Sequence, residues 1–149
     1  MIITKTREEI DVMAMGGHIL KQVLDELSLM VRPGVKTIEI ERKAEKIIND
    51  LGGKPSFKGV NAFPFSVCAS FNEEIVHGLP GDREFKEGDI FTLDFGIFFK
   101  LEKFLGNNFD KKKYPNILNG FHTDMARTFV VGEVDSEKKK AIKYYSQNA

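Results

Sequence analysis

Two aspartates stand in stretches of sequence where a carboxylate is unexpected. Asp94 lies within IFTLDFGIFF (90–99), and Asp124 lies within GFHTDMARTFVV (120–131). Both stretches predict strands among apolar side chains, where an unpaired carboxylate loses several kcal/mol of hydration or becomes protonated. Two such carboxylates on neighbouring strands suggest ligands for hard divalent metal ions. Salt bridges to neighbours such as Arg127 are the alternative explanation.

The remaining sequence predicts the elements that position these aspartates. Thr6 and Glu9 form a capping box, and the apolar spacing after them predicts a helix to about residue 30. Thr37 is a candidate N-cap for a second helix that ends near residue 52. Strands are predicted at 65–70, 74–77, 90–99 and 120–131, followed by a last helix capped by Asp135 or Ser136.

Composition limits the classes of function. The 149 residues contain 22 basic and 22 acidic side chains, and this zero net charge gives no reason to expect a nucleic acid or membrane partner. No apolar run approaches the roughly 20 residues of a bilayer span. Cys68 is the single cysteine, which excludes an internal disulfide and favours the cytoplasm. The run 111–113 of three lysines is better explained as a solvated loop tip than as a nucleic-acid contact.

His77 is the third residue with potential chemistry. It ends a predicted strand just before Gly78 and Pro80, so its imidazole can reach a cleft from a turn. His18 lies among ordinary polar positions of the first helix, where a surface or hydrogen-bonded histidine is the better interpretation.

Several blocks of sequence together resemble type I methionine aminopeptidases, and residues 1–60 fit the opening helices of that family. The blocks are FP at 63–64 through Cys68, SFNEEIVHGLP at 70–80, EGDIFTLD at 87–94, and GFHTD followed by RTF and VG within 120–132. The resemblance implies an α+β protein with half of the pita-bread (creatinase/aminopeptidase) fold, in which helices pack on one face of an antiparallel sheet.

The resemblance also implies a metal site and a catalytic histidine. Asp94 would chelate one divalent ion and Asp124 would bridge two, the ions being cobalt, manganese, iron or zinc. A water activated by these ions would attack the carbonyl of an N-terminal methionine. His77 would bind the substrate, donate a hydrogen bond near the scissile bond and steady the tetrahedral intermediate.

The same resemblance identifies a pocket for the methionine side chain of a nascent protein. Phe63 and Cys68 match positions that line this pocket, and a soft apolar wall suits a thioether. Val60 stands where the family often has tyrosine. His122, next to Asp124, is expected to support the site and not to bind metal.

Two departures from the family shape the expected domain organisation. First, 29 residues separate Asp94 from Asp124, where the family has a tight turn, so an inserted loop is expected at about 100–119. Counting five residues from Asp94 to Phe99 and five from Asn119 to Asp124 predicts equal hairpin arms, each about 17 Å long. Second, the family completes its metal site with one histidine and two glutamates from its second half, which this chain lacks.

Residues 1–149 are therefore expected to form the N-terminal half of a catalytic domain, inactive when alone. The alternative is a non-catalytic half-domain that binds peptide N-termini or a protein partner through its exposed face. Self-association through the same face is left open. A prolidase-type peptidase is the alternative within the enzyme class, but the blocks around Cys68 and at 72–80 favour the methionine-specific family.

Overall fold

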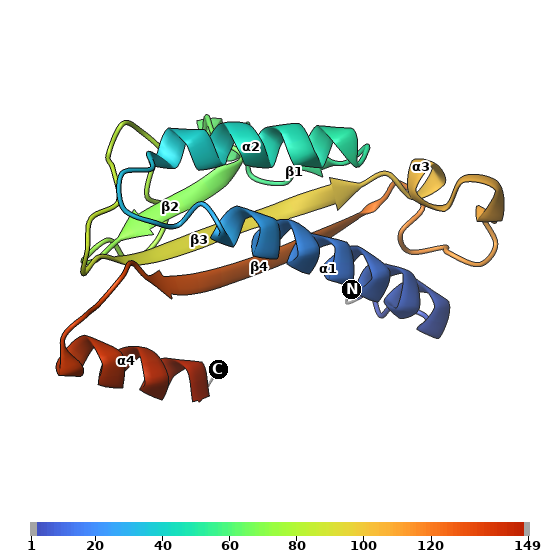
Figure 1. The fold of residues 1–149 in the computed structure, drawn as a ribbon. Coiled ribbons are helices and arrows are strands. Elements are labelled where there is room, and N and C mark those ends of the chain that lie inside the picture. The colour runs from blue at the N-terminus through green and yellow to red at the C-terminus, as the bar shows by residue number, and fades with distance from the viewer. Residues whose placement is uncertain (1–2, 148–149) are drawn as a thin grey trace.

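The computed structural model describes residues 3–147, which form an antiparallel sheet with two long helices against it (Figure 1). The strands are β1 (Lys54–Pro55), β2 (Val67–Phe71), β3 (Ile90–Phe99) and β4 (Phe121–Val130). The helices are α1 (Arg7–Ser28), α2 (Thr37–Asp50), α3 (Leu101–Leu105) and α4 (Ser136–Gln147), with 3-10 turns η1 (Val60–Ala62) and η2 (Gly106–Asn108). None of the helices in this part of the chain is long and apolar enough to cross a membrane.

Strand β3 is the centre of the sheet. It pairs with β4 along one side, while β2 and the short β1 share its other side. The pairing of the two aspartate strands is thus confirmed, but the prediction of equal arms is wrong. Gly96 pairs with Asp124, and Asp94 pairs with Ala126, so the two aspartates are diagonal neighbours instead of direct partners.

The core lies between the sheet and the helices. Alternate β3 side chains from Phe91 to Phe99 point to this side and are buried, because α1 covers β3 and β4 while α2 covers β1 and β2. A Cβ on Gly16 would lie 2.5 Å from the Phe121 ring, which shows how closely α1 approaches β4. The expected fold class, an antiparallel sheet with helices on one face, is confirmed.

The predicted N-terminal caps of α1 and α2 are confirmed in part. The capping box of α1 forms as predicted, since the Thr6 side chain accepts from the Glu9 N–H and Glu9 accepts from the Thr6 N–H. The predicted cap of α2 is wrong, because Lys36 is the N-cap residue and Thr37 is already helical. The Thr37 hydroxyl instead donates to the Gly81 carbonyl oxygen and accepts from the Gly81 N–H, which ties a distant loop to the helix.

The predicted strand at 74–77 is also wrong. Asn72 has a left-handed backbone (φ 48°) that turns the chain directly after β2, and residues 73–79 form an irregular loop. Ile75 in this loop is 90% exposed. The apolar pair Ile75–Val76 does not belong to a strand.

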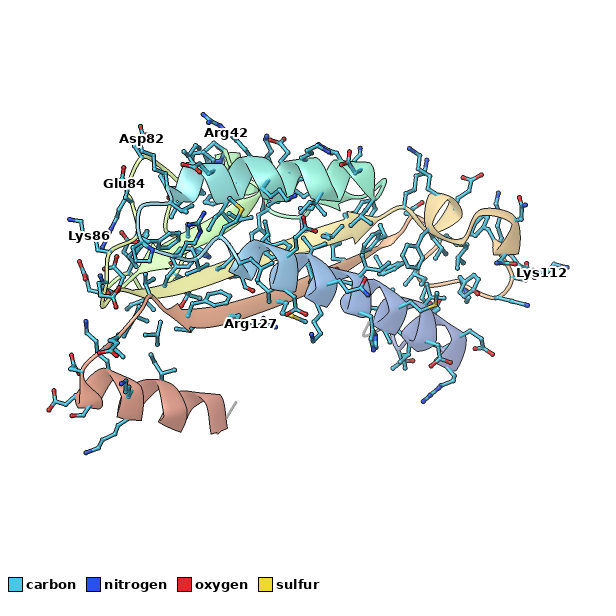
Figure 2. All side chains as sticks on the ribbon, viewed as in Figure 1. Arg42, Asp82, Glu84, Lys86, Lys112 and Arg127 are labelled. Carbon is cyan, nitrogen blue, oxygen red and sulfur yellow. The ribbon has the colours of Figure 1, made fainter. Side chains whose placement is uncertain are left out.

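The connection between β3 and β4 extends from one end of the hairpin (Figure 1). It is more than a polar excursion, because Leu101, Tyr114 and Ile117 are buried in the core. Asn116 also donates two hydrogen bonds to Glu9, joining this segment to α1. The lysine run is exposed as expected, and Lys112 points outward from the far end of the molecule (Figure 2).

Candidate metal centre and binding cavity

Asp94 and Asp124 project from the face of the sheet opposite the helices. Both belong to the alternate set of strand residues that points away from α1 and α2. Diagonal neighbours in an antiparallel sheet have Cα atoms about 7–8 Å apart, within reach of two carboxylates that share ligands. The register therefore brings the two predicted ligands together on one surface.

The environment of Asp94 fits a cation. Its Oδ1 atom is buried and has no hydrogen-bond partner. Burial raises the pKa of Asp94 above its ordinary value, the negative charge of Asp124 raises it further, and nearby His77 partly opposes this. A divalent ion would compensate the two negative charges and satisfy the unpaired oxygen.

The salt-bridge alternative for these aspartates is wrong. Arg127 points to the helical side of β4, where its guanidinium contacts Asp25 of α1 at 2.8 Å (Figure 2). Neither Asp94 nor Asp124 makes an ion pair within residues 3–147. The described residues also include no set of three or more His, Cys, Asp or Glu side chains arranged to hold a metal.

All five predicted site residues line one cavity of about 650 Å³. These residues are Phe63, Cys68, His77, Asp94 and Asp124. The rest of the wall comes from the segment around η1, including Val60, and from Ser56, Phe57 and His122. The cavity is therefore apolar on the side of Phe63 and acidic on the side of the sheet.

Gly78 fixes the position of His77. Its backbone pairs with β2, because the Ala69 N–H donates to the Gly78 carbonyl oxygen at 2.8 Å and the Gly78 N–H donates to Ser70 Oγ at 3.1 Å. A Cβ on Gly78 would lie 2.3 Å from the Ala69 carbonyl oxygen, so only glycine allows this approach. His77 itself has φ 60°, a strained conformation that directs an exposed side chain to the cavity.

Cys68 forms an uncharged part of the cavity wall. It pairs with Asp94 in the β2–β3 ladder and is buried. Burial, followed by the negative charges of Asp94 and Asp124, raises the pKa of Cys68 to about 11. The thiol consequently stays protonated near neutral pH and behaves as a soft apolar group.

Glu41 is a supporting residue that the sequence reasoning missed. It is buried on α2, and its carboxylate accepts from the Ser66 and Val67 N–H groups at 2.8 and 3.0 Å. These bonds fix the start of β2, between Phe63 and Cys68. The signal was present, since an acidic residue stands beside Ile40 and Ala44 on the apolar face of the helix.

His122 lines the cavity and contacts two neighbouring side chains. Its Nδ1 is 2.9 Å from Ser56 Oγ, and its ring lies 4.8 Å from the Phe98 ring. His18 is remote, and its Nδ1 is 2.7 Å from the Ala14 carbonyl oxygen, so the prediction of a hydrogen-bonded histidine is confirmed.

Comparisons with known proteins agree with this geometry. Residues 11–102 match the model of metallopeptidase family M24. The chain is 43% identical over 143 residues to a methionine aminopeptidase of Clostridium perfringens, covering 96% of this chain and 50% of that protein. It thus spans about half the length of the curated relatives it matches.

Solved structures show the same fold. A methionine aminopeptidase from Thermotoga maritima superimposes with a TM-score of 0.76 at 33% identity, covering 96% of this chain and 50% of that one. A prolidase from Pyrococcus horikoshii gives 0.68 at 20% identity, covering 93% of this chain and 33% of that one, which shows the fold alone. Half of the pita-bread fold is therefore present. Because the family model covers more than half of the chain, and the relatives align along nearly all of it, this chain belongs to metallopeptidase family M24.

Proposed function

We propose that this chain forms the N-terminal half of a methionine aminopeptidase catalytic domain, which hydrolyses the first peptide bond of nascent proteins that begin with methionine. The observation that supports this most is the convergence of Phe63, Cys68, His77, Asp94 and Asp124 on one cavity. Family membership implies use of divalent metal. We further propose that Asp94 and Asp124 hold two such ions, of cobalt, manganese, iron or zinc.

In this proposal each residue has a defined role toward the substrate. Phe63 and the protonated thiol of Cys68 receive the methionine side chain. His77 donates a hydrogen bond near the scissile bond and stabilises the oxyanion as it develops. The metal ions, when bound, supply Lewis-acid activation of water and of the carbonyl. Asp94 and Asp124 orient these charges on the open face of the sheet.

Completion of the site requires ligands beyond this pair, and we propose that a second half-domain supplies them over the open face. Two carboxylates leave most of a coordination sphere to water. A reducing, cytoplasmic compartment fits the single buried Cys68. The expected substrates are N-terminal methionyl peptides.

The test joins this chain after Gly132 to the second half of the C. perfringens relative and measures methionine release from a Met-Ala-Ser peptide. We expect turnover by the chimera and none by residues 1–149 alone. His77→Ala should lower kcat by about 100-fold or more while bound metal is retained, whereas Asp124→Ala should lose the metal. His18→Ala is the matched control and should leave both properties unchanged.

Two outcomes would contradict this proposal. One is turnover by residues 1–149 above a metal blank that Asp94→Asn abolishes. The other is loss of metal in His77→Ala, which would make His77 a ligand.

A non-catalytic half-domain that binds peptide N-termini or a protein partner is the second candidate, favoured by the exposed apolar side chains of the 73–79 loop. It would be supported by an inactive chimera together with a chain that still binds methionyl peptides.

A further inference from the structure

A second, smaller hollow adjoins the main cavity at the edge of the sheet. Its volume is about 190 Å³, and its walls are Gly52, Lys54, Phe98, Lys100 and Lys103. Lys54 pairs with Phe98 in the β1–β3 ladder. Lys100 is the N-cap residue of α3, and Lys103 lies within α3, directly after β3. Three lysines from two separate segments are therefore gathered around one depression.

The charges of these lysines are not neutralised by the protein. Five other lysines, at 21, 36, 43, 46 and 58, each contact a carboxylate within 4 Å. Within residues 3–147, Lys54, Lys100 and Lys103 make no ion pair. Glu102 lies between two of them in sequence but does not line the hollow. Positive charges that line one hollow attract an anion to it.

The floor and rim of the hollow suit a compact group. Phe98 provides an apolar floor, and Gly52, which has φ 71° at the end of α2, adds no side chain to the rim. The Phe98 ring lies 4.8 Å from the His122 ring, and His122 lines the main cavity. The two hollows are thus neighbours, separated by the contact between the Phe98 and His122 rings.

We propose that Lys54, Lys100 and Lys103, arranged around Phe98, bind an oxyanion beside the candidate metal cavity. The bound group would be a phosphate or a carboxylate, both of which have several acceptor oxygens. Each lysine ammonium group would attract these oxygens as a compact positive charge. Its source is either a free phosphate compound or an acidic side chain of a peptide that occupies the main cavity. The oxyanion site uses no residue assigned above to catalysis, so it stands or falls separately from the proposed function, and only its peptide source rests on that function.

The test measures binding of inorganic pyrophosphate to the full chain by calorimetry, at low ionic strength, on protein from which metal has been removed with a chelating resin. The site variant is K54Q/K100Q/K103Q. The matched control is K111Q/K112Q/K113Q, which removes the same charge from exposed lysines that do not line the hollow. We expect the site variant to weaken binding at least about tenfold, because three favourable ion contacts are lost, and the control to bind as the parent does.

NMR shows independently where pyrophosphate binds. The chain has three histidines, and pyrophosphate should shift the His122 ring signals, through Phe98, while leaving those of His18 unchanged. Circular dichroism confirms that both triple variants are folded. Equal weakening by the two triple variants, or binding without a His122 shift, would overturn the proposal, because either result would show diffuse attraction to positive charge.

A second binding experiment, with two peptides, identifies the source of the oxyanion. Met-Ala-Ser-Glu-Glu is compared with Met-Ala-Ser-Gln-Gln, each against the parent and the site variant. Tighter binding of the acidic peptide that disappears in the site variant assigns the subsite to peptide carboxylates. Equal binding of the two peptides, together with specific pyrophosphate binding, assigns it to free phosphate compounds.

Discussion

Glu9 and Asp94 have opposite hydrogen-bonding states. Glu9 is fully buried and accepts hydrogen bonds from the Thr6 N–H at 2.9 Å and from the Asn116 N–H and Nδ2 at 2.6 and 3.0 Å. Asp94 Oδ1 is buried and accepts none. A satisfied carboxylate stabilises the fold, whereas an unsatisfied one indicates a ligand that the site is built to bind. Charge alone, as read from sequence, does not separate these cases.

Replacement of Glu9 by Gln should destabilise the protein by about 1–3 kcal/mol at pH 7, because the amide cannot accept all of these bonds. Burial alone would raise the pKa of Glu9, but the hydrogen bonds from Thr6 and Asn116 lower it below the ordinary value of 4.5. A lowered folded-state pKa stabilises the protein above the ordinary pKa, and this contribution is lost as the pH falls through the lower folded-state value.

The stability difference between parent and Glu9→Gln should therefore shrink as the pH drops below about 4.5. Urea unfolding at pH 7 and at several lower pH values measures it. Glu8→Gln, at the exposed neighbouring position, is the control and should change stability by less than about 0.5 kcal/mol. A difference independent of pH would show that the Glu9 charge contributes nothing.

At the scale of elements, the sequence predicted those whose signals are local. The capping box and apolar stripes specify α1 and α2, and apolar runs specify β3 and β4. Features that depend on contacts distant in sequence were not predictable. The Thr37 hydroxyl serves Gly81 instead of capping its own helix, and the offset of Asp94 from Asp124 follows from pairing of whole strands. Asp94 and Asp124 could be singled out because a carboxylate is unexpected in an apolar strand. His77 could be singled out because it stands directly before the turn residues Gly78 and Pro80.

Gly78→Ala should disturb the site through the loop that carries His77. Its Cβ would overlap the Ala69 carbonyl oxygen, so the loop must separate from β2 and lose the hydrogen bonds that join them. We expect a loss of about 1–3 kcal/mol in stability and a changed NMR signal of the His77 ring. Gly81→Ala is the control, because a Cβ there meets nothing within 4 Å. Similar behaviour of the two variants would show that Gly78 does not position His77.

The connection between β3 and β4 gives a second test at this scale. The ladder ends at the Phe99–Phe121 pair, so residues 100–120 can be replaced by an Asn-Gly turn. We expect the register of the aspartates, and hence Mn²⁺ affinity, to persist. Stability should fall by roughly 3 kcal/mol or more, because Leu101, Tyr114 and Ile117 leave the core and Glu9 loses Asn116.

Calorimetric Mn²⁺ titration and urea unfolding measure these two properties. The substitution K111Q/K112Q/K113Q, confined to the exposed tip, should affect neither. Unchanged stability after the replacement would show that residues 100–120 contribute nothing to the core. Lost Mn²⁺ binding would show that they contribute to the metal site.

At the scale of the whole molecule, the helices bury one face of the sheet while the other face carries the cavity and an apolar rim. Ile75 is 90% exposed, and Val76 and Leu79 are each 61% exposed, in the loop that also holds His77. Neighbouring exposed apolar side chains around a cavity are typical of surfaces that another polypeptide covers. For residues 1–149 alone, the available occupant is a second copy.

Residues 1–149 should therefore self-associate reversibly through the 73–79 loop, with a dissociation constant that sedimentation velocity can measure. Ile75→Glu should raise that constant about tenfold or more, because the interface would bury an unpaired charge in place of an apolar side chain. Leu29→Glu is the matched control, since Leu29 is 77% exposed at the end of α1 in the helical layer. Equal effects of the two substitutions would place the contact elsewhere. A chain that stays monomeric at millimolar concentration would show that the rim does not attract a second copy.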